Sequence, residues 1–249
     1  MRPTVFRRYF LPAIFFSCFT PGLYAQLSAK DSVYFLQPIN NAIKEHQQMI
    51  GVDSRLFNGI QYAGYPFSFV KGHQFFDTTA AMPGTITYDD VYYNDVQLLY
   101  DEVSDKAIVI SNQRRVELSS ERINDFTILN HHFVRIVKDS SGKTPISKDG
   151  FYELLYTGKV QVFKKEAKEV FEELSSEQGI LRRILVKVNY YIGKDNSYFP
   201  VTNKKDVMAI YKDRKKEVRD YISNNGLSFR NNKEEAITKV SAYYDQLIK

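Results

Sequence analysis

Short alternating runs of apolar residues, joined by very short polar corners, constrain the fold of this chain most strongly. The runs GTITY (84–88), VYY (91–93) and VQLLY (96–100) are separated by two Asp at 89–90 and by Asn and Asp at 94–95. Alternation with a period of two is typical of strands, and Asp and Asn favour the tight turns of hairpins. Because a parallel crossover needs a dozen or more residues, these corners predict antiparallel neighbours.

The same pattern continues to about residue 201, so we expect an antiparallel sheet over residues 56–201. Further strand candidates lie at 106–110, 115–118, 126–129, 132–137, 150–156, 160–165, 184–192 and 197–201. Small polar residues and Gly at 139–143 predict a loop. The charged stretch 166–178 could extend a long strand or form a short charged helix, and we favour the strand, followed by a loop at 175–179.

Helical patterns flank the predicted sheet on both sides. Residues 38–50 begin with Pro, which suits a first helical turn, and carry apolar residues at helical spacing. The segment 204–249 has similar spacing, a stop signal at Asn225 and Gly226, and Asn232 three residues before Glu235 as a capping pair. We therefore predict an N-terminal helix and a helical C-terminal cover.

The expected fold is α+β, with an antiparallel β-meander curved into a sandwich or partial barrel. The chain contains 18 Tyr, 18 Phe and no Trp, and these rings suit the faces of a sheet. Residues 26–249 have a length typical of one large domain. We find no fixed repeat period and no low-complexity linker.

Residues 1–25 have the pattern of a signal peptide. Arg2, Arg7 and Arg8 precede the apolar run 10–16, and Ala25 is a suitable small residue for cleavage. We expect export to the periplasm or the extracellular space, with cleavage after Ala25. Two alternatives are a membrane anchor, whose apolar run would be interrupted by Pro and polar residues, and a lipoprotein modified at Cys18.

Charge and cysteine content narrow the possibilities further. Cys18 is the only cysteine and lies in the predicted leader, so the mature protein would have to be stabilised by its core. The formal net charge is +5, and the three Arg of the leader account for most of it. The remaining balance gives no reason to expect nucleic-acid binding.

Several phrases of this sequence resemble a known group of proteins. They are LFNG (56–59), GTITYD (84–89), LLYD (98–101), GFYELLY (150–156) and YYD (243–245). They are similar to uncharacterised secreted β-rich proteins of Bacteroidetes bacteria, in which Gly is frequent at the position of Asp90. The resemblance implies an exported fold of this kind over most of the mature chain. It implies no activity, and no functional residue carries over.

The four histidines do not form a recognisable metal motif. His131 and His132 are neighbours in a predicted strand, so their side chains should point to opposite faces. His46 lies on the apolar face of the predicted first helix, and His73 lies in a separate Gly-containing segment. Without a metal-ligand spacing, we predict no transition-metal site.

Acidic residues accumulate between Gly72 and Asp105, where there is no Lys or Arg. They are Asp77, Asp89, Asp90, Asp95, Asp101, Glu102 and Asp105. Carboxylates gathered at hairpin ends could bind Ca²⁺, whereas the simpler interpretation is that Asp forms good turns.

The common nucleophile signatures are missing. There is no GxSxG motif, and Ser140 with Lys143 matches SxxK only in a polar loop without companion motifs. We therefore assign no catalytic, cofactor-binding or metal residues. The basic run 204–219 is typical of the solvated side of a surface helix, with anionic lipid as an alternative partner.

The function expected from these features is an exported, non-catalytic binding or envelope-associated structural module with a possible protein partner. Two alternatives remain open at this point. A curved sheet capped by helices could carry a lipid or another apolar ligand. A pair of carboxylates in a cleft could hydrolyse carbohydrate.

Overall fold

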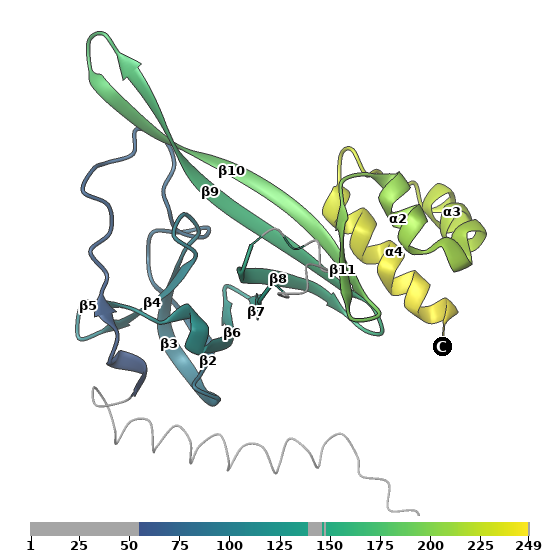
Figure 1. The fold of residues 1–249 in the computed structure, drawn as a ribbon, viewed down its shortest axis with the longest axis horizontal. Helices are drawn as coiled ribbons and strands as arrows, with labels where there is room; N and C mark the ends of the chain where they lie inside the picture. Colours follow the sequence, from purple (N-terminus) through teal and green to yellow (C-terminus); the bar gives the residue numbers. More distant parts are fainter. Residues whose placement is uncertain (1–54, 139–145, 147, 249) are drawn as a thin grey trace, which may run out of the picture. The chain divides into compact units, whose positions relative to one another are not determined.

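The computed structural model describes residues 55–138, 146 and 148–248, which all belong to one compact unit, Lys44–Lys249. The predicted signal peptide and the predicted helix at 38–50 lie outside the described residues. The described strands form one antiparallel sheet that does not close (Figure 1). In the strand order, β1 and β11 are at its two ends.

Eleven strands are described in the sheet. They are β1 (Ile60–Gln61), β2 (Met82–Tyr88), β3 (Val91–Asp101), β4 (Lys106–Ser111), β5 (Arg114–Glu117), β6 (Ile123–Ile128), β7 (His131–Ile136), β8 (Gly150–Thr157), β9 (Gln161–Ser175), β10 (Gly179–Lys194) and β11 (Ser197–Val201). Their order across the sheet is β1-β5-β4-β3-β2-β6-β7-β8-β9-β10-β11. The prediction of antiparallel neighbours is confirmed, and most consecutive strands pair with each other. The order departs from a simple meander where β1 pairs with β5 and β6 pairs with β2.

The sheet begins later in the chain than the sequence predicted. Leu56 lies in a short 3₁₀ helix, η2 (Arg55–Phe57). Between β1 and β2 the chain makes only isolated bridges to the sheet, at Lys71 and at Phe75. This segment contains Gly64, Pro66 and Gly72, and both residue types weaken strand formation.

One predicted hairpin corner is present and the other is not. Asp89 and Asp90 have φ values of 51° and 61° and connect β2 to β3. Asn94 and Asp95 instead lie inside the continuous strand β3, so the second turn is wrong. The register steps from Gly84↔Val96 to Ile86↔Tyr93, which leaves two residues of β3 opposite one of β2. This arrangement is a β-bulge, and Asp95 has the left-handed φ of 56°.

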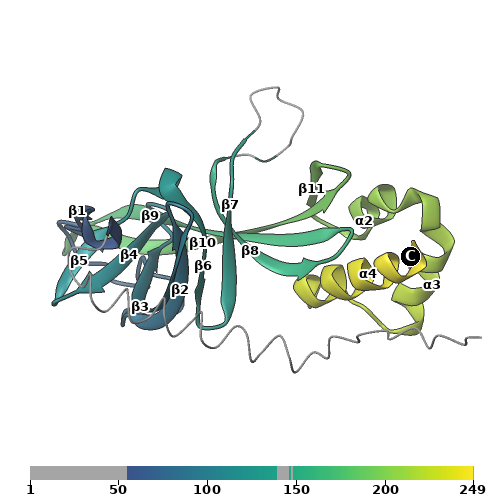
Figure 2. The ribbon, with the colours of Figure 1, turned by 90° about the horizontal axis from the view of Figure 1, so that it is seen from below.

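Strands β1–β8, called the packed region below, enclose an aromatic core. Phe126 stacks on Phe133 with ring centroids 4.9 Å apart, while Tyr100 and Phe151 meet Phe126 edge to face. All four rings are buried. Figure 2 shows β2, β3 and β6 curling beside one another here, as their pairing requires. Burial of such rings is the main favourable term in folding.

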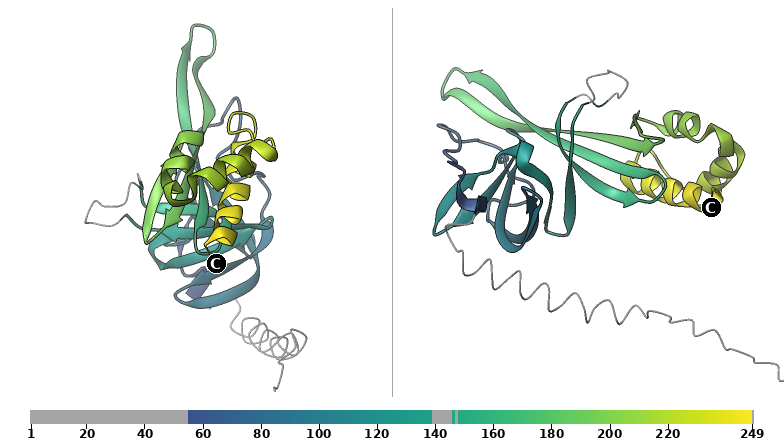
Figure 3. Two further views of the ribbon diagram at one scale, coloured as in Figure 1. Left: turned by 90° about the vertical axis from the view of Figure 1, so that its right-hand side faces the viewer. Right: turned by 60° about the horizontal axis from the view of Figure 1, so that its bottom comes forward.

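Strands β9 and β10 continue beyond the strands beside them. β9 pairs with β8 only over Gln161–Lys164, and β10 pairs with β11 only over Tyr190–Lys194. Residues 165–188, called the ribbon below, therefore form a hairpin whose two strands pair mainly with each other (Figure 3). The predicted strand and the loop near 175–179 are confirmed, with Gly179 at a φ of 74°.

Helices follow the last strand, as predicted. They are α2 (Lys204–Ile210), the 3₁₀ turn η4 (Lys212–Arg214), α3 (Lys215–Asn224) and α4 (Lys233–Leu247), and a further 3₁₀ turn, η3 (Ser120–Arg122), precedes β6. The Asn232 side chain accepts a hydrogen bond from the Glu235 amide, which confirms the predicted cap. In the described part of the chain, no helix combines the length and apolar character that crossing a bilayer requires.

The carboxylate of Asp245 joins α4 to the connection between β8 and β9. It accepts hydrogen bonds from the amides of Lys159 at 2.8 Å and Val160 at 3.1 Å, and from the Tyr156 hydroxyl at 3.0 Å. A Cβ on Gly158 would lie 1.9 Å from Asp245 Oδ2. Glycine is therefore required here for the close approach of α4, which is visible in Figure 2.

Candidate binding surface

The histidines that stood out in the sequence do not converge. His131 Nδ1 lies 2.5 Å from Glu153 Oε1, whereas His132 Nε2 lies 3.4 Å from Asp125 Oδ1. His73 has a buried Nδ1 atom without a hydrogen-bond partner in the structure. Among residues 55–138, 146 and 148–248, no three His, Cys, Asp or Glu side chains are placed to hold a metal ion.

Three other sequence candidates are not placed by the structure. His46, Ser140 and Lys143 lie outside the described residues.

Most of the clustered acids are turn or bulge residues. Asp77, Asp89, Asp90, Asp95 and Asp105 all have φ values between 50° and 61°. Asp is one of the few residues that adopt this left-handed conformation at low cost. Backbone geometry therefore explains why acids are frequent here, and the turn-forming interpretation is the better one.

Two lysines of β9, the buried Lys168 and the partly buried Lys165, join the ribbon to the turn between β3 and β4. Lys165 Nζ lies 2.7 Å from Asp105 Oδ1 and also donates to the Phe151 carbonyl. Lys168 Nζ lies 3.0 Å from Glu102 Oε2, and the Lys168 amide donates to the Glu102 carbonyl at 3.2 Å. We call Lys165, Lys168, Asp105 and Glu102 the lysine clamp.

The carboxylates of Asp101 and Glu102 have different surroundings. Asp101 accepts hydrogen bonds from the Tyr62 hydroxyl at 2.8 Å and the Val103 amide at 2.9 Å. Burial raises the pKa of Glu102 to about 7, against the opposing charge of Lys168. Both side chains are buried, and neither lines the cavities described below. Glu102 attaches the ribbon through Lys168, whereas Asp101 orders the β3–β4 turn and the segment that contains Tyr62.

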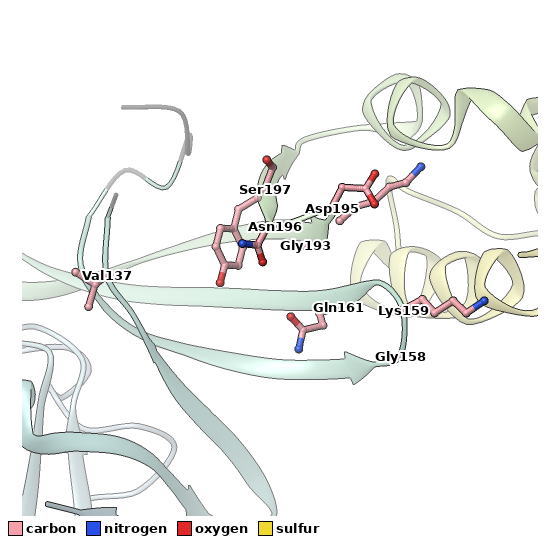
Figure 4. Close-up of a pocket in the computed structure, with 10 residues that line it drawn as sticks. Val137, Gly158, Lys159, Gln161, Gly193, Asp195, Asn196 and Ser197 are labelled. Atoms are coloured by element: carbon pink, nitrogen blue, oxygen red, sulfur yellow. The ribbon is translucent and has the colours of Figure 1, made fainter. Parts of the chain in front are cut away.

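An open cavity of about 440 Å³ lies between two hairpin turns and is lined mainly by polar groups. Figure 4 shows Gln161 of β9 and Asn196 from the β10–β11 turn among its lining residues. Asp195 and Asn196 form that turn with φ values of 50° and 59°. Turn geometry accounts for these residues, and no buried charged group points to a ligand there.

Two further cavities are also open and of mixed character. One of about 790 Å³ lies between Tyr190 and the start of α4, near Glu234 and Lys239. The other, of about 540 Å³, lies beside the bulge of β3, near Met82 and Leu129. Neither resembles the enclosed, mostly apolar pocket that a drug-sized apolar ligand occupies.

The ribbon is where exposed apolar side chains concentrate. Half of the large hydrophobic residues that are exposed in the described part of the chain lie on it: Phe171, Leu174, Ile180, Leu185, Val186 and Val188. Leu174 is 82% exposed, and its direct cross-strand partner Ile180 is 52% exposed. Leu174, Ile180, Val186 and Val188 lie on one face of the ribbon, and Phe171 and Leu185 lie on the other. Exposed apolar side chains gathered on one element mark candidate interaction sites.

Cross-strand ion pairs hold the two strands of the ribbon in register. Arg182 pairs with Glu172 at 2.7 Å, and Lys187 Nζ lies 2.7 Å from Glu169 Oε2. The Arg182 guanidinium also lies 4.2 Å from the centre of the Phe67 ring. These contacts are largely at the surface, so each contributes about 1 kcal/mol or less. They order the ribbon without covering its apolar residues.

Sequence reasoning placed a strand at 184–192 but missed its exposure. The run ILVKV at 184–188 is almost continuously apolar, which usually indicates a strand buried on both faces. The sequence signal that could have indicated this exposure is the charged stretch 166–178, which pairs with the strand that contains 184–188. A strand rich in Lys and Glu cannot cover an apolar neighbour completely.

Comparison of the chain with protein-family models, with curated proteins and with solved structures gave no match.

Proposed function

We propose that this protein is an exported, non-catalytic binding module that engages a protein partner through the ribbon. The observation that carries the proposal is the concentration of exposed apolar side chains on a hairpin that is held in place at its base. Export is supported by the cationic and apolar pattern of residues 1–25. In this proposal the packed region is a partial barrel with a filled interior that supports the ribbon.

The lysine clamp supports a binding role because it orders the ribbon before any partner arrives. Lys165 and Lys168 tie β9 to the β3–β4 turn. The other strand, β10, is tied to residues 70–71 by hydrogen bonds of Val70 with Arg182 and of Ile184 with Lys71. A preordered surface loses less conformational entropy on binding.

The other two functions have weaker support in the described residues. For an apolar carrier, the cavities described above are open, and the packed region is filled by rings such as Phe126 and Phe133. For a carboxylate hydrolase, Asp101 and Glu102 have different environments, yet they are buried away from those cavities. The ribbon therefore favours binding over either alternative.

Photo-crosslinking in the cells that produce the protein tests the proposal. A photoreactive amino acid at Leu174 should yield a discrete crosslinked species with a second protein, identified by mass spectrometry. The matched control is the same amino acid at Val91, which is 43% exposed but lies in the packed region. Ile180→Asp, directly opposite Leu174, should abolish the crosslink.

Two outcomes would contradict the proposal. One is the absence of any crosslink at Leu174, and the other is equal labelling at Leu174 and Val91. Intact-mass measurement of the exported protein gives a separate test of export, with a mature chain that begins at Gln26 as the expected result.

A further inference from the structure

One stretch of β10 has an open edge in the described part of the molecule. Before it, Lys71 bridges to Arg183, and the Ile184 amide donates to the Lys71 carbonyl. After it, pairing with β11 begins at Tyr190. Residues 185–189, called the edge window below, pair with β9 on one side and have no strand on the other side among the described residues. Unpaired strand edges are templates for another strand.

The backbone groups of the edge window point outward in a known pattern. The Arg182 carbonyl and the Ile184 amide face away from β9, because both bond to residues 70–71. Strand geometry repeats every two residues, and no register shift interrupts the pairing of β9 with β10. The amides and carbonyls of Val186 and Val188 therefore face the open edge, where the amides can donate hydrogen bonds to an added strand and the carbonyls can accept them from it.

The side chains of the edge window define what would fit beside them. Val186 and Val188 lie on one face and are 52% and 40% exposed. Lys187 lies on the opposite face, and its side chain is 60% exposed. An adjacent strand would place apolar residues next to the two valines and a charged residue next to Lys187. The surface pair of Lys187 with Glu169 is weak enough to be shared.

A second copy of this chain is a poor occupant of the edge window. A symmetric antiparallel pairing centred on the window would place Lys187 directly opposite Lys187 of the other copy. Like charges that face each other across strands are destabilising, and an edge lysine is a common defence against self-pairing. The charge instead favours a partner strand with an acidic residue at its centre.

We propose that the edge window binds an extended segment of a partner protein as an additional strand, with an apolar, acidic, apolar pattern facing Val186, Lys187 and Val188. This inference rests on the proposed binding function and names the chemistry of the segment that is bound. Main-chain hydrogen bonds would give affinity, and the alternating side chains would give specificity.

Amide hydrogen exchange on the full-length protein tests whether the edge is open. The amides of Val186 and Val188 should exchange rapidly in the free protein and slowly with a short capped peptide whose centre is valine, glutamate, valine. The Ile184 amide is the internal control, because its bond to Lys71 should protect it in both states. Protection of Val186 and Val188 without peptide would overturn the proposal, since the edge would already be covered.

A charge-swap experiment tests the specificity. The glutamate peptide should bind at least about tenfold more tightly than the same peptide with lysine at its centre, and Lys187→Glu should reverse this preference. Methylation of the peptide nitrogen that donates to the edge should also weaken binding about tenfold. The matched protein control is Lys216→Glu on the exposed side of α3, which should leave both affinities unchanged.

The outcomes separate this inference from the proposed function. Equal affinity of both peptides for wild-type protein, or no effect of nitrogen methylation, would overturn strand addition at the edge window. A crosslink at Leu174 that persists in Lys187→Glu would then still support partner binding through the tip of the ribbon. Absence of the Leu174 crosslink in both the wild-type protein and the Lys187→Glu variant would contradict the proposed function itself.

Discussion

The packed region and the ribbon are built from the same antiparallel pairing, yet they are stabilised differently. In the packed region, rings such as Phe126 and Phe133 are buried against each other. In the ribbon, Phe171 and Leu174 are exposed, and the strands are held by ion pairs and by the lysine clamp. An isolated two-stranded hairpin is only marginally stable, so the clamp explains how the ribbon can extend beyond its neighbours.

This difference separates residues that maintain the fold from residues that are free to serve function. Apolar side chains inside a core are explained by stability alone. Apolar side chains on an ordered, uncovered hairpin contribute little to the free energy of folding. Stability therefore does not explain why they are there. We infer partner binding from this contrast, and the predictions below test it from the largest expected effect to the smallest.

Two phenylalanine variants give the sharpest test of the contrast. Phe126→Ala should lower the free energy of unfolding by about 3–5 kcal/mol, because it leaves a cavity among buried rings. Phe171→Ala, at 45% exposure, should lower it by less than about 1 kcal/mol. Urea denaturation followed by circular dichroism measures both values. Similar losses in the two variants would show that the ribbon is part of the core.

The lysine clamp should make stability depend on pH. The folded-state pKa of Glu102 is about 7, above its ordinary value of 4.5, so the folded protein retains a proton that the unfolded chain releases. Stability therefore falls as pH rises from about 4.5 to 7 and then levels off. Lys168→Met should cost about 3 kcal/mol near pH 8 and less near pH 5, because the unpaired carboxylate is neutral at the lower pH.

The matched control for the clamp is the double variant Glu102→Gln with Lys168→Met. Its free energy of unfolding should lose this pH step, because no ionisable group remains in the pair. Denaturation at both pH values measures it. A cost of Lys168→Met that is the same at both pH values would show that Glu102 does not titrate in this range.

Substitutions at turn positions with positive φ should change the free energy of unfolding in opposite directions in the packed region and in the ribbon. Gln113 has a φ of 64° between β4 and β5, so Gln113→Gly should raise the free energy of unfolding by about 0.5–1 kcal/mol. Gly179 has a φ of 74° at the end of the ribbon, and a Cβ there would meet open space. Gly179→Ala should therefore lower stability by about 1 kcal/mol through backbone strain alone. Thermal unfolding compares the two, and a gain for Gly179→Ala would contradict the assigned turn.

The smallest effect on stability is expected at the tip of the ribbon. The double variant Leu174→Ser and Ile180→Ser should change the free energy of unfolding by less than about 0.5 kcal/mol, because both side chains are solvated. The same variant should lose the partner crosslink, measured with the photoreactive group at Glu172, which lies on the same face as Leu174. A large loss of stability would mean that the tip is covered within the protein itself.

Local sequence signals predicted much of the sheet, because its corners depend on short-range chemistry. The Asp89–Asp90 turn and the Asn232 cap follow from the backbone preferences of single residues. The position of the clamp could not be predicted, since it joins Lys168 to Glu102 across a long stretch of sequence. The exposure of Val186 and Val188 was also hidden, because a strand's apolar character does not reveal whether anything lies beside it.

The bulge in β3 has a consequence for how this gene can change. Tyr93 and Val96 are both buried although they are three residues apart, which strict alternation would forbid. Losing one of the two intervening codons would restore regular pairing and leave Tyr93 and Val96 on the same face. A one-residue deletion should therefore be tolerated better at the bulge than elsewhere in β3, where it would turn one flank of the strand to the opposite face.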